Sequence, residues 1–182
     1  MFILASSSPR RQLLLKKLVS DFMILSPNVD ERALDALYDP SRLSKEESLL
    51  KAYTIFKDHP NDEVLSADTI VVLENQVLGK PKDKEDAVRM LLKESGKKQV
   101  VLTSYTYLGK GKEITRTVRS FVYFNPLTEE EIRTYVDRFL PLDKAGSYGI
   151  QDPFPLVSRI EGSYDNIMGL PTEDIAKHVF RN

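Results

Sequence analysis

The 182-residue sequence contains no cysteine, which excludes disulfides, thiolate metal sites and catalysis by a cysteine nucleophile. Its formal net charge is only −1, so it lacks the basic excess of a dedicated nucleic-acid-binding protein. It has no apolar run of membrane-spanning length, and its N-terminus lacks the charged and long apolar regions of a signal peptide. We therefore expect a cytoplasmic protein with no stable nucleic-acid partner and no membrane partner.

The residues that are present have an ordinary globular composition, 41% hydrophobic and 29% charged. A chain of this length can bury a sizeable core, as one domain or as two small lobes. Strand-like and helix-like segments alternate, with no low-complexity linker and no internal repeat. Because crossover helices occur together with a hairpin, we expect an α/β fold with a mixed sheet. The pattern predicts strands at 2–5, 64–73, 77–78, 98–108, 112–124 and 156–160, tight turns at 75–76 and 109–111, and helices that start near residues 8, 44, 83, 128 and 172.

The helix near residue 44 is predicted from a capping box. Ser44 is followed three residues later by Glu47, the spacing at which the two side chains can satisfy each other's backbone N–H groups. An apolar stripe with helical spacing follows, so Ser44 is expected to be the N-cap and Glu47 a residue of the first turn.

A run of three serines, a proline and two arginines follows the first strand directly, at residues 6–11. Pro9 suits the first turn of a helix, and Ser8 is a good N-cap. A helix N-terminus favours anions, and the guanidinium groups of Arg10 and Arg11 match phosphate oxygens in a bidentate way. The segment is therefore either a phosphate site or an ordinary capped helix with solvated arginines.

Asp68 lies among apolar residues in the second strand, so its carboxylate is either paired in a salt bridge or poised for chemistry. By strand alternation it shares a face with Ser66 and Ile70, while Thr69 points to the other face. The turn before Lys80 should bring that lysine back towards Asp68. A carboxylate and a lysine close together suit metal-assisted attack on a phosphate.

A third segment, residues 142–151, contains two glycines that allow close approach of the backbone to a ligand. The conformation expected at Gly146 and Gly149 is one that other residues resist. Gln151 offers both a donor and an acceptor, which suits reading of a nucleobase edge. A glycine-rich surface loop is the alternative.

Together these segments resemble the Maf family, nucleoside-triphosphate pyrophosphatases also described as septum-formation inhibitors. The resemblance covers nearly the whole chain, so residues 1–182 are interpreted as a single Maf-like domain. It depends on the motifs LASSSPRR (4–11), VDE (29–31), KA (51–52), ADT (67–69), LGKP (78–81), SG (95–96), DKAGSYGIQ (143–151), GSY (162–164) and GLP (169–171).

The resemblance implies hydrolysis between the α and β phosphates of a nucleoside triphosphate, with Mg²⁺ or Mn²⁺ as cofactor. It also implies an elongated mixed sheet whose two lobes flank a central cleft, as in the inosine-triphosphate pyrophosphatases. By motif, the roles implied are a general base at Asp68, a metal held by Asp68 and Glu31, charge neutralisation by Lys80 and Lys51, phosphate contacts from Ser8 and Arg11, and specificity positions at Arg10, Thr69 and Gln151.

The loop at Tyr148-Gly149-Ile150-Gln151 resembles that of the dTTP/UTP subgroup. In the subgroup that hydrolyses 7-methyl-GTP, this loop has a different sequence. Gln99 stands where a histidine is common in the family, and Asp152 where a glycine is common. Two alternatives stay open: a 7-methyl-GTP pyrophosphatase, and a non-catalytic, nucleotide-responsive regulator of cell division. The expected partner is a small nucleotide, and a homodimer is left open.

Overall fold

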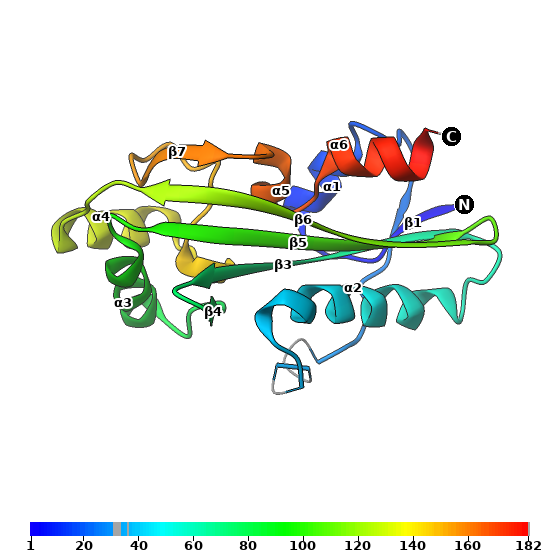
Figure 1. Ribbon diagram of the computed structural model, residues 1–182, viewed down its shortest axis with the longest axis horizontal. Coiled ribbons are helices and arrows are strands. Elements are labelled where there is room, and N and C mark those ends of the chain that lie inside the picture. Colours follow the sequence, from blue (N-terminus) through cyan, green and yellow to red (C-terminus); the bar gives the residue numbers. More distant parts are fainter. Residues whose placement is uncertain (31–33, 36, 182) are drawn as a thin grey trace.

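The computed structural model describes residues 1–30, 34–35 and 37–181, which are arranged around one long sheet (Figure 1). Its order is β2-β1-β3-β5-β6-β7, with β4 paired to β3. β1 is parallel to β2 and β3 and all other pairs are antiparallel, which confirms the predicted mixed sheet. The strands are β1 (Phe2–Leu4), β2 (Met23–Ile24), β3 (Glu63–Leu73), β4 (Gln76–Leu78), β5 (Lys98–Gly109), β6 (Lys112–Phe124) and β7 (Val157–Glu161).

Helices cover both faces of this sheet. One face packs against α2 (Pro40–Phe56), and the opposite face carries α1 (Pro9–Leu15), α5 (Tyr164–Met168) and α6 (Thr172–Ile175) (Figure 1). At the far end of the sheet lie α3 (Lys84–Glu94) and α4 (Glu129–Phe139), with a short 3-10 turn at Ala145–Ser147, and the chain closes with a wide helical turn at Ala176–Phe180. No helix in the described part of the chain has the length and apolarity to cross a bilayer.

The tight connections follow from local sequence. The β5–β6 hairpin turns at Lys110-Gly111, and both residues have positive φ (51° and 71°), as a two-residue hairpin turn requires. The β3–β4 turn lies at Glu74-Asn75, again with positive φ (50° and 64°). The prediction of Asn75-Gln76 was therefore wrong by one residue, because Gln76 already belongs to β4 and pairs with Leu73.

The predicted caps are confirmed for three helices. Ser8, Asp83 and Thr128 each accept a hydrogen bond from a backbone N–H of the following helix. The prediction for α2 was wrong: this helix is capped by Asp39, whose side chain accepts from the Arg42 N–H at 3.2 Å. Ser44 lies inside the helix and is fully buried, with its hydroxyl 2.8 Å from that of Ser104.

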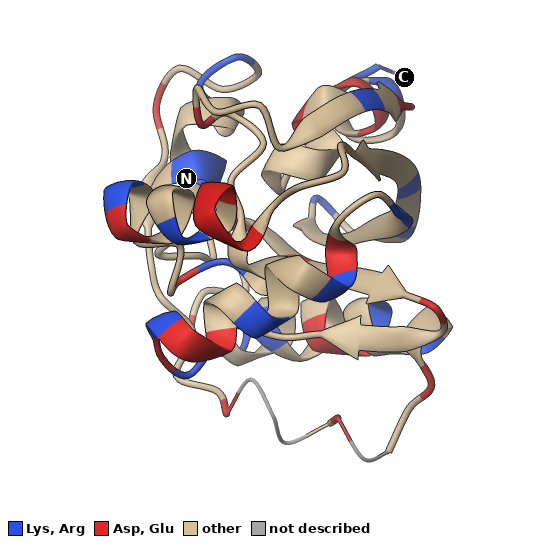
Figure 2. Ribbon diagram, turned by 90° about the vertical axis from the view of Figure 1, so that its left-hand side faces the viewer, with Lys and Arg blue, Asp and Glu red and all other residues tan. Residues whose placement is uncertain are grey.

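Two main hydrophobic clusters lie towards opposite ends of the sheet, which gives the expected two lobes. One cluster joins α3, α4 and β4 around residues such as Leu91, Ile132 and Val136. The other joins β1, α1 and α6 around Leu4, Leu14 and Ile175, and β3 contributes to both. Along the helices, Lys and Arg positions are interspersed with Asp and Glu positions, in keeping with the nearly neutral charge (Figure 2).

Candidate active site

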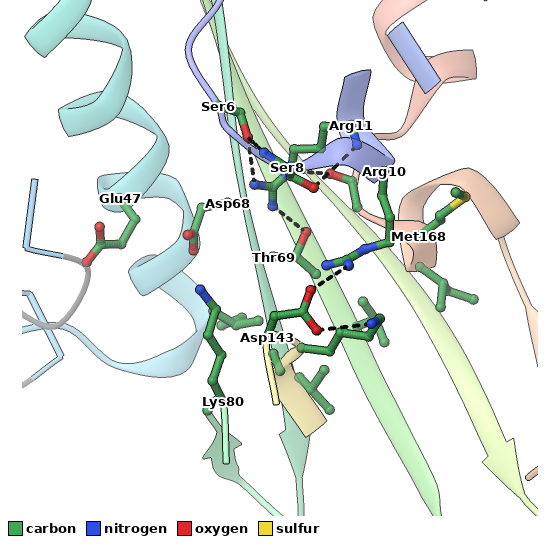
Figure 3. A pocket seen from close by; sticks show the side chains of 18 of the residues that line it. Ser6, Ser8, Arg10, Arg11, Glu47, Asp68, Thr69, Lys80, Asp143 and Met168 are labelled. Carbon is green, nitrogen blue, oxygen red and sulfur yellow. Dashed lines mark hydrogen bonds and ion pairs between the residues drawn. The ribbon is translucent and has the colours of Figure 1, made fainter. Parts of the chain in front are cut away.

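The site lies where one edge of β3 has no strand partner. β1 pairs with β3 only as far as Leu65, and β4 begins to pair with the same edge at Val71. Between them, at 66–70, no described strand pairs with that edge, and a pocket of about 770 Å³ opens there. We call it the central pocket (Figure 3). Its walls come from the start of α1, from α2 and β3, and from the segments 78–80, 143–151 and 167–169.

Asp68 occupies the middle of this unpaired stretch of β3. Its Oδ1 accepts a hydrogen bond from Lys51 Nζ of α2 at 2.8 Å, in an ion pair whose side chains are 16% and 8% exposed. No described residue donates to the other carboxylate oxygen, Oδ2. The salt-bridge interpretation of Asp68 is therefore confirmed for one oxygen, and its role in chemistry stays a prediction.

Two further charged side chains lie beside Asp68. Lys80 follows β4, and its ammonium group points towards Asp68, as predicted from the turn (Figure 3). Glu47 lies one helical turn before Lys51 and is 2% exposed, yet it also lines the central pocket. Glu31, the second carboxylate expected in the site, lies outside the described residues.

Arg11 is held rigidly on the other side of β3. Its Nε donates to the Gly169 carbonyl at 2.8 Å, and its Nη2 donates to Thr69 Oγ1 at 3.1 Å. The Thr69 hydroxyl lies 2.9 Å from that of Thr103. Thr69 thus faces α1, whereas Ser66 bonds to the Ser48 carbonyl of α2, which confirms the predicted alternation along β3.

Ser8 and Arg10 lie at the start of α1 and line the pocket on the same wall as Arg11. The Ser8 hydroxyl caps α1 by accepting from the Arg11 N–H at 3.4 Å. Arg10 lies 3.5 Å from the carboxylate of Asp143 across the pocket (Figure 3). Partial burial disfavours the Asp143 charge, but the hydrogen bond and charge of Lys144, with the charge of Arg10, hold the pKa of Asp143 below its usual value.

The loop at residues 143–151, which we call the substrate loop, forms the third wall of the pocket and ends at the exposed Gln151. The left-handed conformation expected at Gly146 is present, with φ of 75°. The same expectation for Gly149 was wrong, because its φ is not positive. A Cβ at Gly149 would lie 2.9 Å from a carboxylate oxygen of Asp152, so a larger residue there would displace that side chain.

Comparison with known proteins places the chain in a family. The sequence profile described as Maf-like protein matches residues 1–181. The chain belongs to the Maf family. A protein of Thermosipho africanus named dTTP/UTP pyrophosphatase is 44% identical over 174 residues, which cover 95% of this chain and 88% of that protein. Another of that name, from Symbiobacterium thermophilum, is 43% identical over 170 residues, covering 93% of this chain and 87% of that protein.

A solved structure, that of the Staphylococcus aureus Ham1 protein, is 15% identical with a TM-score of 0.47, over 68% of this chain and 70% of that chain.

The residues given by the Maf resemblance meet in one place. Those that the structure describes all line the central pocket: Ser8, Arg10, Arg11, Lys51, Asp68, Thr69, Lys80 and Gln151. Glu47 was not predicted to line the pocket, because its spacing from Ser44 was interpreted as a capping box. The signal that could have found it is its position four residues before Lys51, which places both side chains on one face of a helix.

The two neighbouring arginines should differ in their effect on stability. We expect Arg11→Ala to lower the free energy of unfolding by about 1–3 kcal/mol, because it leaves buried acceptors without a charged donor. The matched control Arg10→Ala removes only an ion pair to an exposed carboxylate and should cost less than about 1 kcal/mol. Urea unfolding of both variants measures the difference, and equal losses would contradict the tethering role of Arg11.

Proposed function

We propose that this Maf-family protein hydrolyses dTTP and UTP to the nucleoside monophosphate and pyrophosphate. The observation that carries the proposal is the position of Asp68, ion-paired through one oxygen and open through the other, in a pocket that also contains Lys80, Arg10 and Arg11. The alignments with the relatives named dTTP/UTP pyrophosphatase cover more than nine-tenths of the chain, which supports the same reaction.

In the proposed reaction, water attacks the α phosphorus. Asp68 Oδ2 accepts the proton that this water loses, and the bond from the α phosphorus to the bridging oxygen breaks, so that pyrophosphate leaves with the electron pair of that bond. The positive charge of Lys80 stabilises negative charge that develops on the phosphate oxygens. Ser8 and Arg11 orient the phosphate chain from the opposite wall.

The proposal includes Mg²⁺ or Mn²⁺, which in such reactions neutralises phosphate charge and activates water. No group of three or more potential metal ligands exists among the described residues. The donor set nevertheless fits the usual binding of Mg²⁺ through one or two carboxylates and the substrate's own phosphates. The Asp68 carboxylate would be one such ligand, and we retain Glu31 as the expected second one. Glu47 is a further carboxylate on the same wall.

Base recognition is assigned to Gln151, Arg10 and Thr69. Uracil and thymine share an N3–H donor flanked by two carbonyl acceptors, and the Gln151 amide can accept from the former while donating to the latter. Arg10 has five N–H donors, and its one contact with Asp143 leaves others for a base carbonyl. Thr69 contributes by holding Arg11 in place.

The location and the partner of the enzyme also belong to the proposal. We propose that the enzyme acts in the cytoplasm on a free nucleotide, and the nearly neutral charge supports the absence of a stable nucleic-acid partner.

Loss of the proposed base should abolish most of the activity. We expect Asp68→Asn to lower turnover by at least roughly a hundredfold, the usual loss when a positioned general base is removed. Asp137→Asn is the matched control, because Asp137 pairs with Lys84 on the exposed surface.

Ion-exchange chromatography of the products should show monophosphate and pyrophosphate. Diphosphate and orthophosphate as first products would exclude attack at the α phosphorus.

Removal of divalent cations should also stop the reaction. In excess EDTA, pyrophosphate release should fall to background, and added Mg²⁺ or Mn²⁺ should restore it, because the polyanionic substrate meets carboxylates in the pocket. Full activity in EDTA would end the metal part of the proposal and leave the role of Asp68 standing.

The nucleotide preference tests the base assignment. We expect dTTP and UTP to exceed CTP, dCTP and the purine triphosphates in kcat/KM by roughly tenfold or more, because cytosine reverses the donor and acceptor pattern of the edge. Gln151→Ala should reduce this preference for dTTP and UTP by a larger factor than it reduces the rate with the best substrate. A panel led by 7-methyl-GTP would move the protein to the other subgroup, and no hydrolysis of any nucleotide would favour a non-catalytic regulator.

A further inference from the structure

One buried acidic residue has no part in the proposed reaction. Glu94 is the last residue of α3 and is 0% exposed, within the cluster formed by α3, α4 and β4. Its Oε1 accepts a hydrogen bond from the Gln99 side-chain amide at 2.7 Å. Its Oε2 has no hydrogen-bond partner among the described residues.

These surroundings favour the protonated form of Glu94. The elements packed around it present Gln99 from β5, Tyr148 from the substrate loop and Tyr135 from α4, with Asp152 behind Tyr135. No lysine, arginine or histidine among the described residues forms an ion pair with it. The C-terminus of a helix also disfavours a negative charge. Burial accordingly raises the pKa of Glu94 well above its usual value.

A chain of hydrogen bonds connects Glu94 to the central pocket. The Tyr148 hydroxyl donates to Gln99 Oε1 at 2.6 Å, and the same amide donates onward to Glu94. Tyr148 lines the pocket and packs edge-to-face on Phe124 at 4.9 Å. The substrate loop also lies directly on the carboxyl, since a Cβ at Gly146 would be 3.0 Å from Glu94 Oε1.

The loop needs such an anchor because part of its backbone is strained. Ser147 has a φ of 62°, a left-handed conformation that a residue with a side chain seldom adopts. Such a conformation persists only where the surrounding contacts hold it. The chain from Glu94 reaches the next residue, Tyr148, and a second set of bonds through the Tyr135 hydroxyl holds Gly149.

We propose that Glu94 is a positioning residue that acts in its protonated form, through Gln99 and Tyr148, to hold the substrate loop in its binding conformation. The proposal rests on the proposed function for the identity of the substrate only. Glu94 does not itself line the central pocket, so its effect should fall on nucleotide binding through Gln151 and Asp143, and less on the chemical step.

The kinetic test compares three variants. Glu94→Gln keeps a neutral group of the same shape and an acceptor for Gln99, so the KM for dTTP should stay within about threefold of wild type. Glu94→Leu leaves the Gln99 amide unpaired, and Tyr148→Phe breaks the chain at its other end. For both, we expect KM to rise roughly tenfold, with kcat changed by less than about threefold. Unchanged KM in both variants would overturn the positioning role.

Hydrogen exchange provides a readout that needs no substrate. Amides at 143–151 should exchange faster in Glu94→Leu and Tyr148→Phe than in wild type, while those of α4 change less, and Glu94→Gln should resemble wild type. Equal exchange of the loop in all four proteins would contradict the proposal. If wild type hydrolyses neither dTTP nor UTP, the proposed function fails, and this measurement still decides whether Glu94 positions the loop.

The proton on Glu94 can be measured by unfolding. Above the ordinary glutamate pKa the unfolded chain releases this proton and the folded chain keeps it, so stability falls as pH rises towards the raised folded pKa. In this range the unfolding constant of wild type, divided by that of Glu94→Gln, should rise about tenfold per pH unit. A ratio that does not change from pH 5 to 8 would show that the folded protein holds no such proton.

Discussion

β3 is paired with β5 along one edge without a break from Val64 to Val72, whereas on its other edge pairing stops at Leu65 and resumes at Val71. In a complete sheet, the side chains of neighbouring residues in a strand point to opposite faces. The backbones of the adjacent strands then keep the two faces apart. Here no strand in the described part of the chain occupies that position beside residues 66–70. Asp68, facing α2, and Thr69, facing α1, can therefore contribute to one pocket. The separation of reacting and recognition groups on two walls follows from this gap.

The cationic side chains of the pocket differ in how rigidly they are held. Lys51 is buried against Asp68, and Arg11 is fixed by the Gly169 carbonyl and Thr69, so neither needs to be ordered when a polyanion arrives. Arg10 is partly exposed and shares its charge with Asp143. Groups that are already oriented stabilise developing charge without reorganisation during the reaction. The rigid cations thus suit the phosphates, and the adaptable Arg10 suits the variable part of the ligand.

Local signals predicted much of the fold because the interactions involved span few residues. Ser8, Asp83 and Thr128 cap helices as expected, and alternation along β3 placed Asp68 and Thr69 on the correct faces. The start of α2 was wrong because Asp39 with Pro40 and Ser44 with Glu47 are both acceptable starts, and only packing against β5 decides between them.

The partners of the site residues could not be predicted in this way. That Lys51 pairs with Asp68, that Arg11 reaches Gly169, and that Glu94 lies under the substrate loop depend on contacts between distant parts of the chain. Lys51 was found only through the family motif. Glu94 carries no signal in the sequence, because an acidic residue at the end of an amphipathic helix is normally exposed to solvent.

The bond from Arg11 to Gly169 joins residues that are 158 positions apart. A ribosome adds about 5–20 residues per second, so the arginine is incorporated roughly 8–30 seconds before its acceptor. During that interval the Arg11 guanidinium lacks the carbonyl that holds its Nε. The pocket is therefore completed only after the segment 167–169 has been synthesised, and a nascent chain that stalls before this segment lacks one of the pocket's walls.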